Sequence, residues 1–444
     1  MLILSSPDIR IENGVIAEMG EGLAPLPGEE VIDARGLLAL PGGIDVHTHM
    51  DLDVGFTRSS DSFFTGTRAA ACGGTTTIVD HPAFGPAGCS LHHQIDAYHE
   101  LAADAVIDYG FHGVVQRVDD GILAEIPALM EAGVTSFKFY MTYDRRLKAP
   151  QILQLLQAAR ALGALPMVHC EDHEMLTALR EELVREGHTQ PIYHAKSRPA
   201  DCEARAVKEM LALAAQAENA PLYIVHVSTK GGIEAIADYR AAGGRIYAET
   251  CPQYLTLDES LYEREDGLNF ILSPPLRRAE DREALLAAIE AGVVDVVGTD
   301  HCPFTTEQRK RGADNFTLCP NGLPGVELRF NLLYSELVAS GRVKLERFTD
   351  LVSTNPAKLF GLYPQKGVLA VGSDADLVLF DPGETWTVTR DLLHENVDYT
   401  PYEGMRLQGR VRATIARGET VYKDGVFTGQ PGRGRFIRRR KSHV

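Results

Sequence analysis

The chain has little of what marks secreted, membrane or thiolate-metal proteins. Its 444 residues include seven cysteines, an odd number with no CxxC pair, which disfavours a disulfide framework and a thiolate zinc cluster. No apolar run approaches the roughly 18 residues that span a bilayer. The N-terminal segment MLILSSPDIRIENG has no basic region followed by a long apolar stretch. We therefore expect reduced thiols, a cytoplasmic location, no membrane partner and no secretory signal.

Positive charge is also scarce. The sequence has 44 Lys and Arg residues against 61 Asp and Glu, a formal net charge of −17. Nucleic acids and anionic membranes are bound through basic surfaces, so we expect no nucleic-acid partner. The exception is a short basic segment, RGRFIRRRKSHV at 433–444, which we expect to be solvated or to contact another subunit.

From about residue 40 the sequence alternates short β-branched runs with stretches such as 151–162 and 203–217, whose apolar spacing suits helices. Eight strands separated by helical crossovers predict parallel pairing, and eight is the number that closes a (β/α)8 TIM-like barrel. The competing open, doubly wound sheet usually carries a nucleotide loop, and neither GxGxxG nor GxxxxGK[ST] occurs here. The candidate strands are 43–47, 75–80, 108–115, 134–139, 165–169, 222–227, 245–249 and 293–298.

The two ends of the sequence differ from this pattern. Residues 1–35 contain short strand-like pieces, and 366–429 return to that style, with Asp424-Gly425 between VYK and VFT as a hairpin signal. The length favours one large domain with an accessory module. We expect a small β-sandwich domain built from residues 1–40 and 366–444, beside a barrel of residues 41–365.

The polar residues that end the candidate strands carry the functional signal. In a β/α barrel, side chains at the C-terminal strand ends project into the active-site mouth. Strand one ends in His47-Thr48-His49, and residues two apart in a strand share one face. His169, His226 and Asp300 end three further strands. Four imidazoles and a carboxylate on one rim predict a site for Zn²⁺ or a similar ion.

Other polar residues near the strand ends fit less simply. We interpret His81, His112, His173 and Glu249 as supporting or structural residues, because the ligand count is complete without them. Lys138, in an otherwise apolar strand, is the anomaly. A buried ammonium is costly, which favours a neutral amine. From the residues alone we expect this lysine to be paired with a carboxylate.

These residues lie in motifs that resemble a known family. PGGIDVHTH at 41–49, SFK at 136–138 and GTDH at 298–301, with His169 and His226, resemble the cyclic amidohydrolases. Within them the resemblance is to the hydantoinase/dihydropyrimidinase branch, and especially to the bacterial D-phenylhydantoinases. It covers nearly the whole chain, including 63–77, 271–277 and 320–327. Relatives carry an additional strand or two before the equivalent of Ile9–Gly20, so we expect either that the small domain lacks an edge or that the start codon is misassigned.

The resemblance implies two divalent metal ions per subunit, Zn²⁺ by default, with Mn²⁺ or Co²⁺ as alternatives for these ligands. His47, His49 and Asp300 would hold one ion, His169 and His226 the other, and a carboxylated Lys138 would bridge them. The substrate's amide framework would be bound by Tyr143, Ser273 and Asn321. The implied reaction is hydrolytic ring opening of a cyclic amide by a hydroxide held between the metals. Asp300 would act as general acid and base, and Tyr143 would help to stabilise the oxyanion.

The expected substrates are 5-monosubstituted hydantoins with aromatic substituents, which would yield N-carbamoyl amino acids. Asp51 stands where dihydroorotases carry an arginine that holds a ring carboxylate, which disfavours an anionic substrate. The loop 50–64 would cover the pocket, where Phe56, Phe63 and Phe64 either contact the aromatic group or simply pack. The alternatives are a dihydropyrimidinase, an allantoinase and a non-catalytic dihydropyrimidinase-like scaffold. A homotetramer is usual for such relatives.

Overall fold

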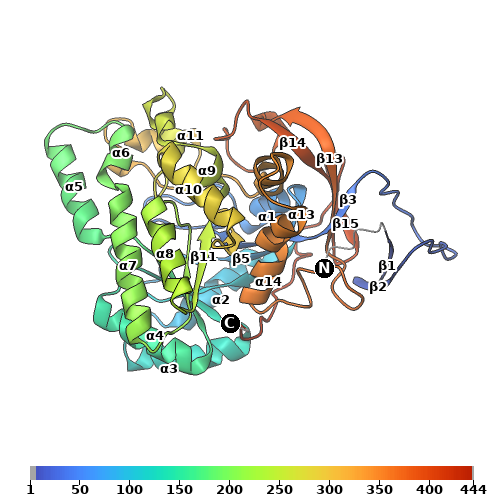
Figure 1. Ribbon diagram of the computed structural model, residues 1–444, viewed down its shortest axis with the longest axis horizontal. Coiled ribbons are helices and arrows are strands. Elements are labelled where there is room, and N and C mark those ends of the chain that lie inside the picture. The colour runs from blue at the N-terminus through green and yellow to red at the C-terminus, as the bar shows by residue number, and fades with distance from the viewer. Residues whose placement is uncertain (1–6, 443–444) are drawn as a thin grey trace.

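The computed structural model describes residues 7–442. Residues 1–6 and 443–444 lie outside the described residues. They include the start of the segment in which no secretory signal is expected and the end of the basic segment. The expectation that the small domain lacks an edge strand also concerns residues outside the described range. The chain forms a barrel wrapped by helices and a smaller antiparallel sheet at one side (Figure 1). None of the helices within 7–442 combines the length and the apolar character that crossing a bilayer requires.

The larger unit is a (β/α)8 barrel, as the alternation of strands and helices predicts. Its parallel strands form two hydrogen-bonded runs, β4 to β6 and β7 to β12, and β6 and β7 follow one another along the chain around His112. A parallel bridge between Thr48 and His301 joins the first and last strands and closes the barrel. The strands are β4 (Gly43–Thr48), β5 (Thr75–Asp80), β6 (Asp108–Phe111), β7 (Gly113–Val114), β8 (Ser136–Tyr140), β9 (Leu165–His169), β10 (Leu222–Ile224), β11 (Ile246–Thr250) and β12 (Val296–Val297).

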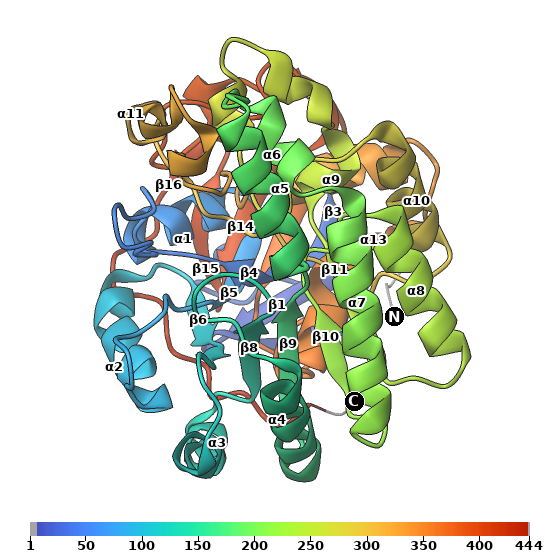
Figure 2. The same cartoon turned by 90° about the vertical axis from the view of Figure 1, so that its left-hand side faces the viewer.

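The helices pack around the barrel (Figure 2). Local sequence determines where individual helices begin and end. α3 begins where the Asp119 side chain accepts a hydrogen bond from Ile122 N, and it ends at Gly133, whose φ of 102° is the left-handed value that favours glycine. The main helices are α1 (Phe63–Cys72), α2 (Leu91–Leu101), α3 (Asp120–Ala132), α4 (Ala149–Leu162), α5 (His173–Arg185), α6 (Ile192–Ser197), α7 (Ala200–Gln216), α8 (Lys230–Ala241), α10 (Ala279–Glu290) and the short α9 (Pro252–Thr256), α11 (Thr306–Arg309), α12 (Arg329–Leu333), α13 (Leu345–Thr349) and α14 (Asn355–Leu359).

Several strands end earlier than the sequence pattern predicts. The predicted strand 108–115 is interrupted at His112, whose ring bonds to Ser136 Oγ and Val46 O across the barrel. The predicted strand 222–227 ends at Ile224 because His226 has φ 39°, which no regular strand residue adopts. Hydrophobic runs identify a strand, whereas the point at which it leaves the sheet depends on contacts with other strands.

The interior of the barrel is filled by side chains. Ile44, Val46, Val79, Met167 and Tyr223 form one buried cluster with residues of the 357–363 segment, which covers the barrel floor. Close packing of this kind fills the floor of the barrel, so the candidate ligands at the strand ends lie at the opposite rim.

The smaller unit is an antiparallel sheet contributed by both ends of the chain. Its order is β3-β13-β14-β15-β16, and a separate hairpin, β1-β2, is tied to it through Ile16 N and Ser373 O. The predicted hairpin at Asp424-Gly425 is confirmed, since both residues have positive φ between paired strands. The strands are β1 (Asp8–Glu12), β2 (Val15–Gly20), β3 (Leu38–Pro41), β13 (Leu377–Thr387), β14 (Arg406–Ala416), β15 (Glu419–Lys423) and β16 (Val426–Phe427).

The basic C-terminal segment packs along the barrel, so the expectation of a solvated end holds for its exposed residues Arg435, Arg438, Arg440 and Lys441 but not for Arg439, and contact with another subunit stays a prediction. Ile437 N donates to Tyr109 O at 2.8 Å, so the segment runs beside β6, and Phe436 stacks on Phe111 with ring centroids 5.6 Å apart. Arg439 is only 3% exposed and donates to Ser136 Oγ and Phe111 O at the barrel floor. The backbone hydrogen bond to Tyr109 and the ring contact with Phe111 therefore hold this segment against the barrel, although the segment is basic.

Candidate metal centre

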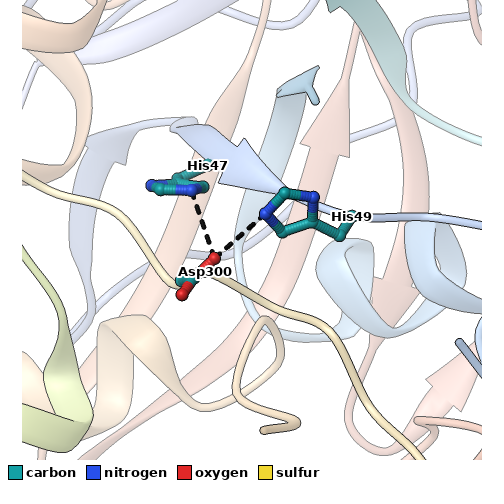
Figure 3. A group of neighbouring side chains, drawn as sticks. All are labelled: His47, His49 and Asp300. Atoms are coloured by element: carbon teal, nitrogen blue, oxygen red, sulfur yellow. Dashed lines mark ion pairs between the residues drawn. The ribbon is translucent and has the colours of Figure 1, made fainter. Parts of the chain in front are cut away.

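His47, His49 and Asp300 come together at the C-terminal rim of the barrel (Figure 3). His47 lies in β4, His49 one residue beyond its end, and Asp300 three residues after β12. The carboxylate of Asp300 lies between the two rings, with Oδ1 3.1 Å from the Nε2 atom of each. The bridge that closes the barrel is therefore also what brings the metal-binding candidates of the first and last strands to one point.

Three of the predicted site residues hold a left-handed backbone. The φ values are 54° for Asp300, 39° for His226 and 71° for Tyr143. Such values are uncommon for residues other than glycine, and they cluster at active sites, where the surrounding structure enforces them. The rim is thus built for the placement of these side chains at some cost to the local backbone.

His47 is held in the orientation that a metal ligand needs. Its Nδ1 lies 2.5 Å from Glu249 Oε1, whose carboxylate also accepts bonds from Tyr223 OH (2.9 Å) and His226 N (3.0 Å). With the proton of Nδ1 committed to Glu249, the lone pair of Nε2 faces Asp300. Nε2 itself is buried without a properly directed hydrogen bond. An acceptor nitrogen aimed at a carboxylate oxygen is a fit for a cation between them.

Electrostatics at this point also favour a cation. Burial opposes a charge on His47, but Glu249 and Asp300 outweigh it and raise the pKa of the ring to about 9. Burial likewise opposes the charge of Asp300, yet His47 and His49 hold its pKa well below the ordinary value. A metal ion at Nε2 would satisfy the same carboxylates in place of the proton.

The second pair of imidazoles lies beside the first. The ring centroids of His169 and His226 are 4.5 Å apart, and those of His226 and His47 are 5.4 Å apart. Burial lowers the pKa of both His169 and His226, so both are neutral and can donate a lone pair. His169 Nε2 lies 2.7 Å from Glu171 Oε2, so the lone pair of Nδ1 is the one available to a metal ion.

Lys138 is buried in the same region, only 1% exposed. Burial lowers the pKa of its amine to about 8, against the opposing attraction of Asp300 and Glu249. The carboxylate partner expected from the residues alone is absent: within residues 7–442, no Asp or Glu oxygen lies within the 4.0 Å of an ion pair with Nζ. The amine lies over the ring of Tyr140, with Nζ 5.3 Å from the ring centroid. An amine so placed is partly neutral near pH 8, the form that can react with CO₂.

The three predicted substrate-binding residues are placed unequally. Tyr143 lies beside the centre, its ring 5.3 Å from that of His169. Ser273 Oγ is a buried atom without a hydrogen-bond partner. Asn321 is exposed, in a loop joined to the segment of Ser273 by the bond from Gly322 N to Ile271 O. Two of the three therefore face the interior, and the third lies on the adjoining surface loop.

The four residues interpreted as supporting or structural differ in their contacts. His173 lies with Nδ1 3.4 Å from Thr142 Oγ1. Glu249 orients His47, and His112 bonds to the backbone of β4 through Val46 O (3.0 Å). His81 stacks against His47 at 4.4 Å, and neither of its ring nitrogens has a partner. Sequence reasoning missed the Glu171–Arg198 pair behind His169, although a glutamate two residues after a candidate ligand was a usable signal.

The aromatic residues of the 50–64 segment differ in their burial. Phe63 is fully buried and packs edge-on against Tyr98 and Phe111, so packing is its role. Phe56 is half exposed and lies under Arg311. Asp51 accepts a bond from Phe63 N and thereby supports the start of α1.

Comparison with known proteins agrees with this architecture. The Amidohydrolase family matches residues 38–421. The chain is 52% identical over 436 residues to the D-phenylhydantoinase of Escherichia coli O1:K1 / APEC, covering 98% of this chain and 94% of that protein.

Solved structures give the same picture. The dihydropyrimidinase of Brevibacillus agri NCHU1002 superposes with a TM-score of 0.96 at 43% identity, over 99% of this chain and 96% of the other. The L-hydantoinase of Arthrobacter aurescens superposes with a TM-score of 0.89 at 29% identity, over 97% and 95%. With the closed barrel, the histidine-rich rim and these matches together, the chain belongs to the amidohydrolase family.

Proposed function

We propose that this chain hydrolyses the ring amide of 5-monosubstituted hydantoins with aromatic substituents, producing N-carbamoyl amino acids. One observation carries the proposal: donor atoms of His47, His49 and Asp300 lie within 4.8 Å of one another beside buried Lys138. The relative that shares 52% of its residues is named for phenylhydantoin. The lower identity of the protein named L-hydantoinase, 29%, supports a preference for the D-enantiomer.

The residues present fit two divalent ions. His47, His49 and Asp300 would hold one, and His169 and His226 the other, with Lys138 as a carbamate between them; Zn²⁺ is the first choice for these ligands and Mn²⁺ or Co²⁺ the alternatives. When bound, the ions supply Lewis acidity to the ring carbonyl and lower the pKa of a water.

Asp300 is placed to move the proton. Its low pKa keeps the carboxylate ionised at neutral pH, ready to accept a proton from the attacking water. The same carboxyl group then delivers the proton to the ring nitrogen that leaves, which completes the ring opening.

Tyr143 is placed to donate. Burial raises the pKa of its hydroxyl to about 12, so it keeps its proton throughout the working range. A neutral hydroxyl near the centre can donate to the oxyanion that forms at the carbonyl. Ser273, with an unpartnered Oγ, and Asn321 would hold the remaining amide groups of the ring. The adjacent ring of Tyr140, 5.9 Å from Tyr143, offers an apolar face to an aromatic substituent.

A dihydropyrimidinase is the second candidate. It is favoured by the Brevibacillus agri structure, whose protein bears that name at 43% identity, and the ring opening would use the same groups. A non-catalytic scaffold is disfavoured because all six ligand positions carry residues that can bind a metal. No observation favours an allantoinase.

For the assembly and location we propose a homotetramer in the cytoplasm. The seven cysteines are all free, as expected of a reducing compartment. Light scattering should give four times the 48.5 kDa of the chain; a monomer or dimer would contradict the tetramer.

The function is tested by turnover on D-5-phenylhydantoin, dihydrouracil and allantoin, with bound metal counted in the same samples. We expect at least two ions per chain and the highest kcat/KM on the hydantoin; a much better rate on dihydrouracil would favour the second candidate. Lys138→Ala should lose metal and turnover together, because the bridge is gone. The matched control is Lys208→Ala, on the exposed face of α7. A Lys138→Ala protein that keeps the wild-type metal content and full activity would refute the two-metal scheme.

A further inference from the structure

A second cluster of metal-binding residue types lies at the junction of the barrel and the antiparallel sheet. Cys72 is the last residue of α1, Glu327 precedes α12, and His394 lies in the loop between β13 and β14. The Cys72 thiol, one carboxylate oxygen of Glu327 and one ring nitrogen of His394 all lie within 4.8 Å of one another. We call these three residues the junction cluster. None of them belongs to the ligand set at the barrel rim.

We propose that the junction cluster binds a third divalent ion, with Zn²⁺ as the natural occupant. Thiolate, imidazole and carboxylate are the three protein ligand types of zinc, and three protein ligands with an open fourth position is an established coordination pattern. Tetrahedral bonds of about 2.0–2.3 Å place ligand atoms roughly 3.3–3.8 Å apart. Small side-chain rotations would therefore bring the three donors to that spacing.

Space for one water-sized species is present beside Cys72 and Glu327, two of the three proposed ligands. A cavity of about 20 Å³ is lined by Cys72 and Glu327, with Asn331, Trp386, Arg410 and Tyr422 around it. That volume holds one water-sized species. The side chain of His394 is 25% exposed, whereas that of Glu327 is 6% exposed, so the site is reached from the surface on the histidine side.

The charges around the cavity favour a cation. Glu327 accepts bonds from His394 N (2.6 Å) and lies 2.7 Å from His394 Nδ1, and its own N–H faces the carboxylate of buried Glu395. Burial raises the pKa of Glu395, His301 opposes that shift, and the charge of Glu327 adds to it, so the two carboxylates influence each other in the interior. Arg410 also lines the cavity, but its guanidinium is paired with Glu384 at 2.8 Å. Its positive charge is therefore compensated by Glu384. Arg68 is a second nearby cation: its Nη2 donates to His394 O at 2.6 Å, and its charge favours the thiolate form of Cys72 against the effects of burial and of Glu327.

Binding would exchange a proton for the ion at Cys72. Burial and the charge of Glu327 raise the pKa of the thiol, so without an ion it carries its proton. Coordination would replace the S–H bond by a sulfur–metal bond and release one proton to solvent. The residue would then contribute a thiolate, the form in which cysteine binds zinc.

The junction cluster is also linked to the rim. The loop that carries His394 continues to Asn396, whose N–H donates to Asp61 Oδ1 at 2.9 Å. Asp61 Oδ2 lies 3.0 Å from His301 Nε2, and His301 follows Asp300 directly. An ion that fixes His394 would therefore anchor the loop that supports the catalytic aspartate from behind.

The experiment is a Co²⁺ titration of the purified holoenzyme, after removal of loosely bound metal. Metal per chain is counted, and thiolate-to-cobalt charge-transfer absorption is followed in the near ultraviolet. We expect one equivalent more in the wild-type chain than in Cys72→Ser, and an absorption band that Cys72→Ser and His394→Ala both lack. His394→Ala guards against a folding defect in Cys72→Ser, because it alters a partly exposed loop residue.

Cys89→Ser is the matched control, since Cys89 is a partly exposed thiol outside the junction cluster. This variant should keep both the third equivalent and the band. The proposal is overturned if the wild-type chain shows no charge-transfer band, if the band survives in Cys72→Ser and His394→Ala, or if it disappears in Cys89→Ser. None of these results would affect the two-metal count at the rim, which Lys138→Ala tests separately.

Discussion

Replacing Glu249 with Gln removes one negative charge behind His47 while keeping a side chain of nearly the same size. Three donors converge on the Glu249 carboxylate: His47 Nδ1, His226 N and Tyr223 OH, at 2.5, 3.0 and 2.9 Å. Glutamine has one oxygen, so at least one of these buried donors would meet an NH₂ group. An unsatisfied buried donor costs about 1–3 kcal/mol.

The expected consequence is weaker metal binding at the rim. Partners that orient a metal-bound histidine typically contribute about 10–100-fold in affinity, or about 1.4–2.7 kcal/mol. Protons compete with the metal for His47, and this competition changes the affinity difference between the variant and the wild-type chain. The pKa of His47 is raised to about 9, partly by Glu249, so the wild-type ring must lose a proton to bind metal below that pH. Glu249→Gln relieves that competition, and the deficit should therefore be larger at pH 9.5 than at pH 7.

Competition with a chelator of known affinity measures the effect at both pH values. Tyr223→Phe is the matched control, because it removes one of the three donors but leaves the carboxylate on His47. It should change the dissociation constant by less than about threefold. If Glu249→Gln at pH 9.5 binds metal as tightly as the wild-type chain, or if Tyr223→Phe weakens binding equally, the role assigned to Glu249 is wrong.

Three further changes follow from the structure. Asp300→Asn should lower kcat by about 10²–10⁴-fold even at saturating metal, since the proton acceptor is lost; turnover within tenfold of wild type would contradict this. Burial raises the pKa of Glu395 to about 7 from an ordinary 4.5, so its ionisation destabilises the fold as the pH rises from about 4.5 through 7. Glu395→Gln should therefore gain stability relative to wild type across that window in urea unfolding, and parallel pH profiles would refute it. Phe436→Ala should cost about 3 kcal/mol in the same assay, the lower end of the range for Phe→Ala because the ring that stacks on Phe111 is only partly buried, while metal content stays unchanged; a lost metal would show that the floor and the rim are not independent.

The parts of this structure that local pattern determines were predictable from the sequence. The alternation of strand and helix signals predicts the barrel, and the two-residue spacing of His47 and His49 places both rings on one face. The pairing of His47 with Glu249 is different, because 202 residues separate them and only the neighbouring strands bring them together. The same is true of the junction cluster, whose members lie on three elements far apart in the chain.

The misjudged features were those in which tertiary contacts override a local preference. Six basic residues among the last twelve suggest a solvated end. Arg439 is nevertheless buried, because its guanidinium donates to Ser136 Oγ and Phe111 O at the barrel floor. A hydrophobic run at 222–227 suggests a full-length strand, yet the left-handed backbone of His226 ends it early to aim the ring. Both departures lie where the fold uses a residue for a contact that its neighbours in sequence do not reveal.

The C-terminal segment that runs beside β6 bears on how the chain is made. Synthesis proceeds from the N-terminus, and domains generally fold in that order. Here Phe436 and Arg439 fill the barrel floor against Phe111 and Ser136, which emerge from the ribosome some three hundred residues earlier. The strands that carry the rim histidines are therefore made before the residues that cover this side of the floor. We expect a fusion that displaces Phe436 or Arg439 to weaken the floor without removing any candidate ligand at the rim.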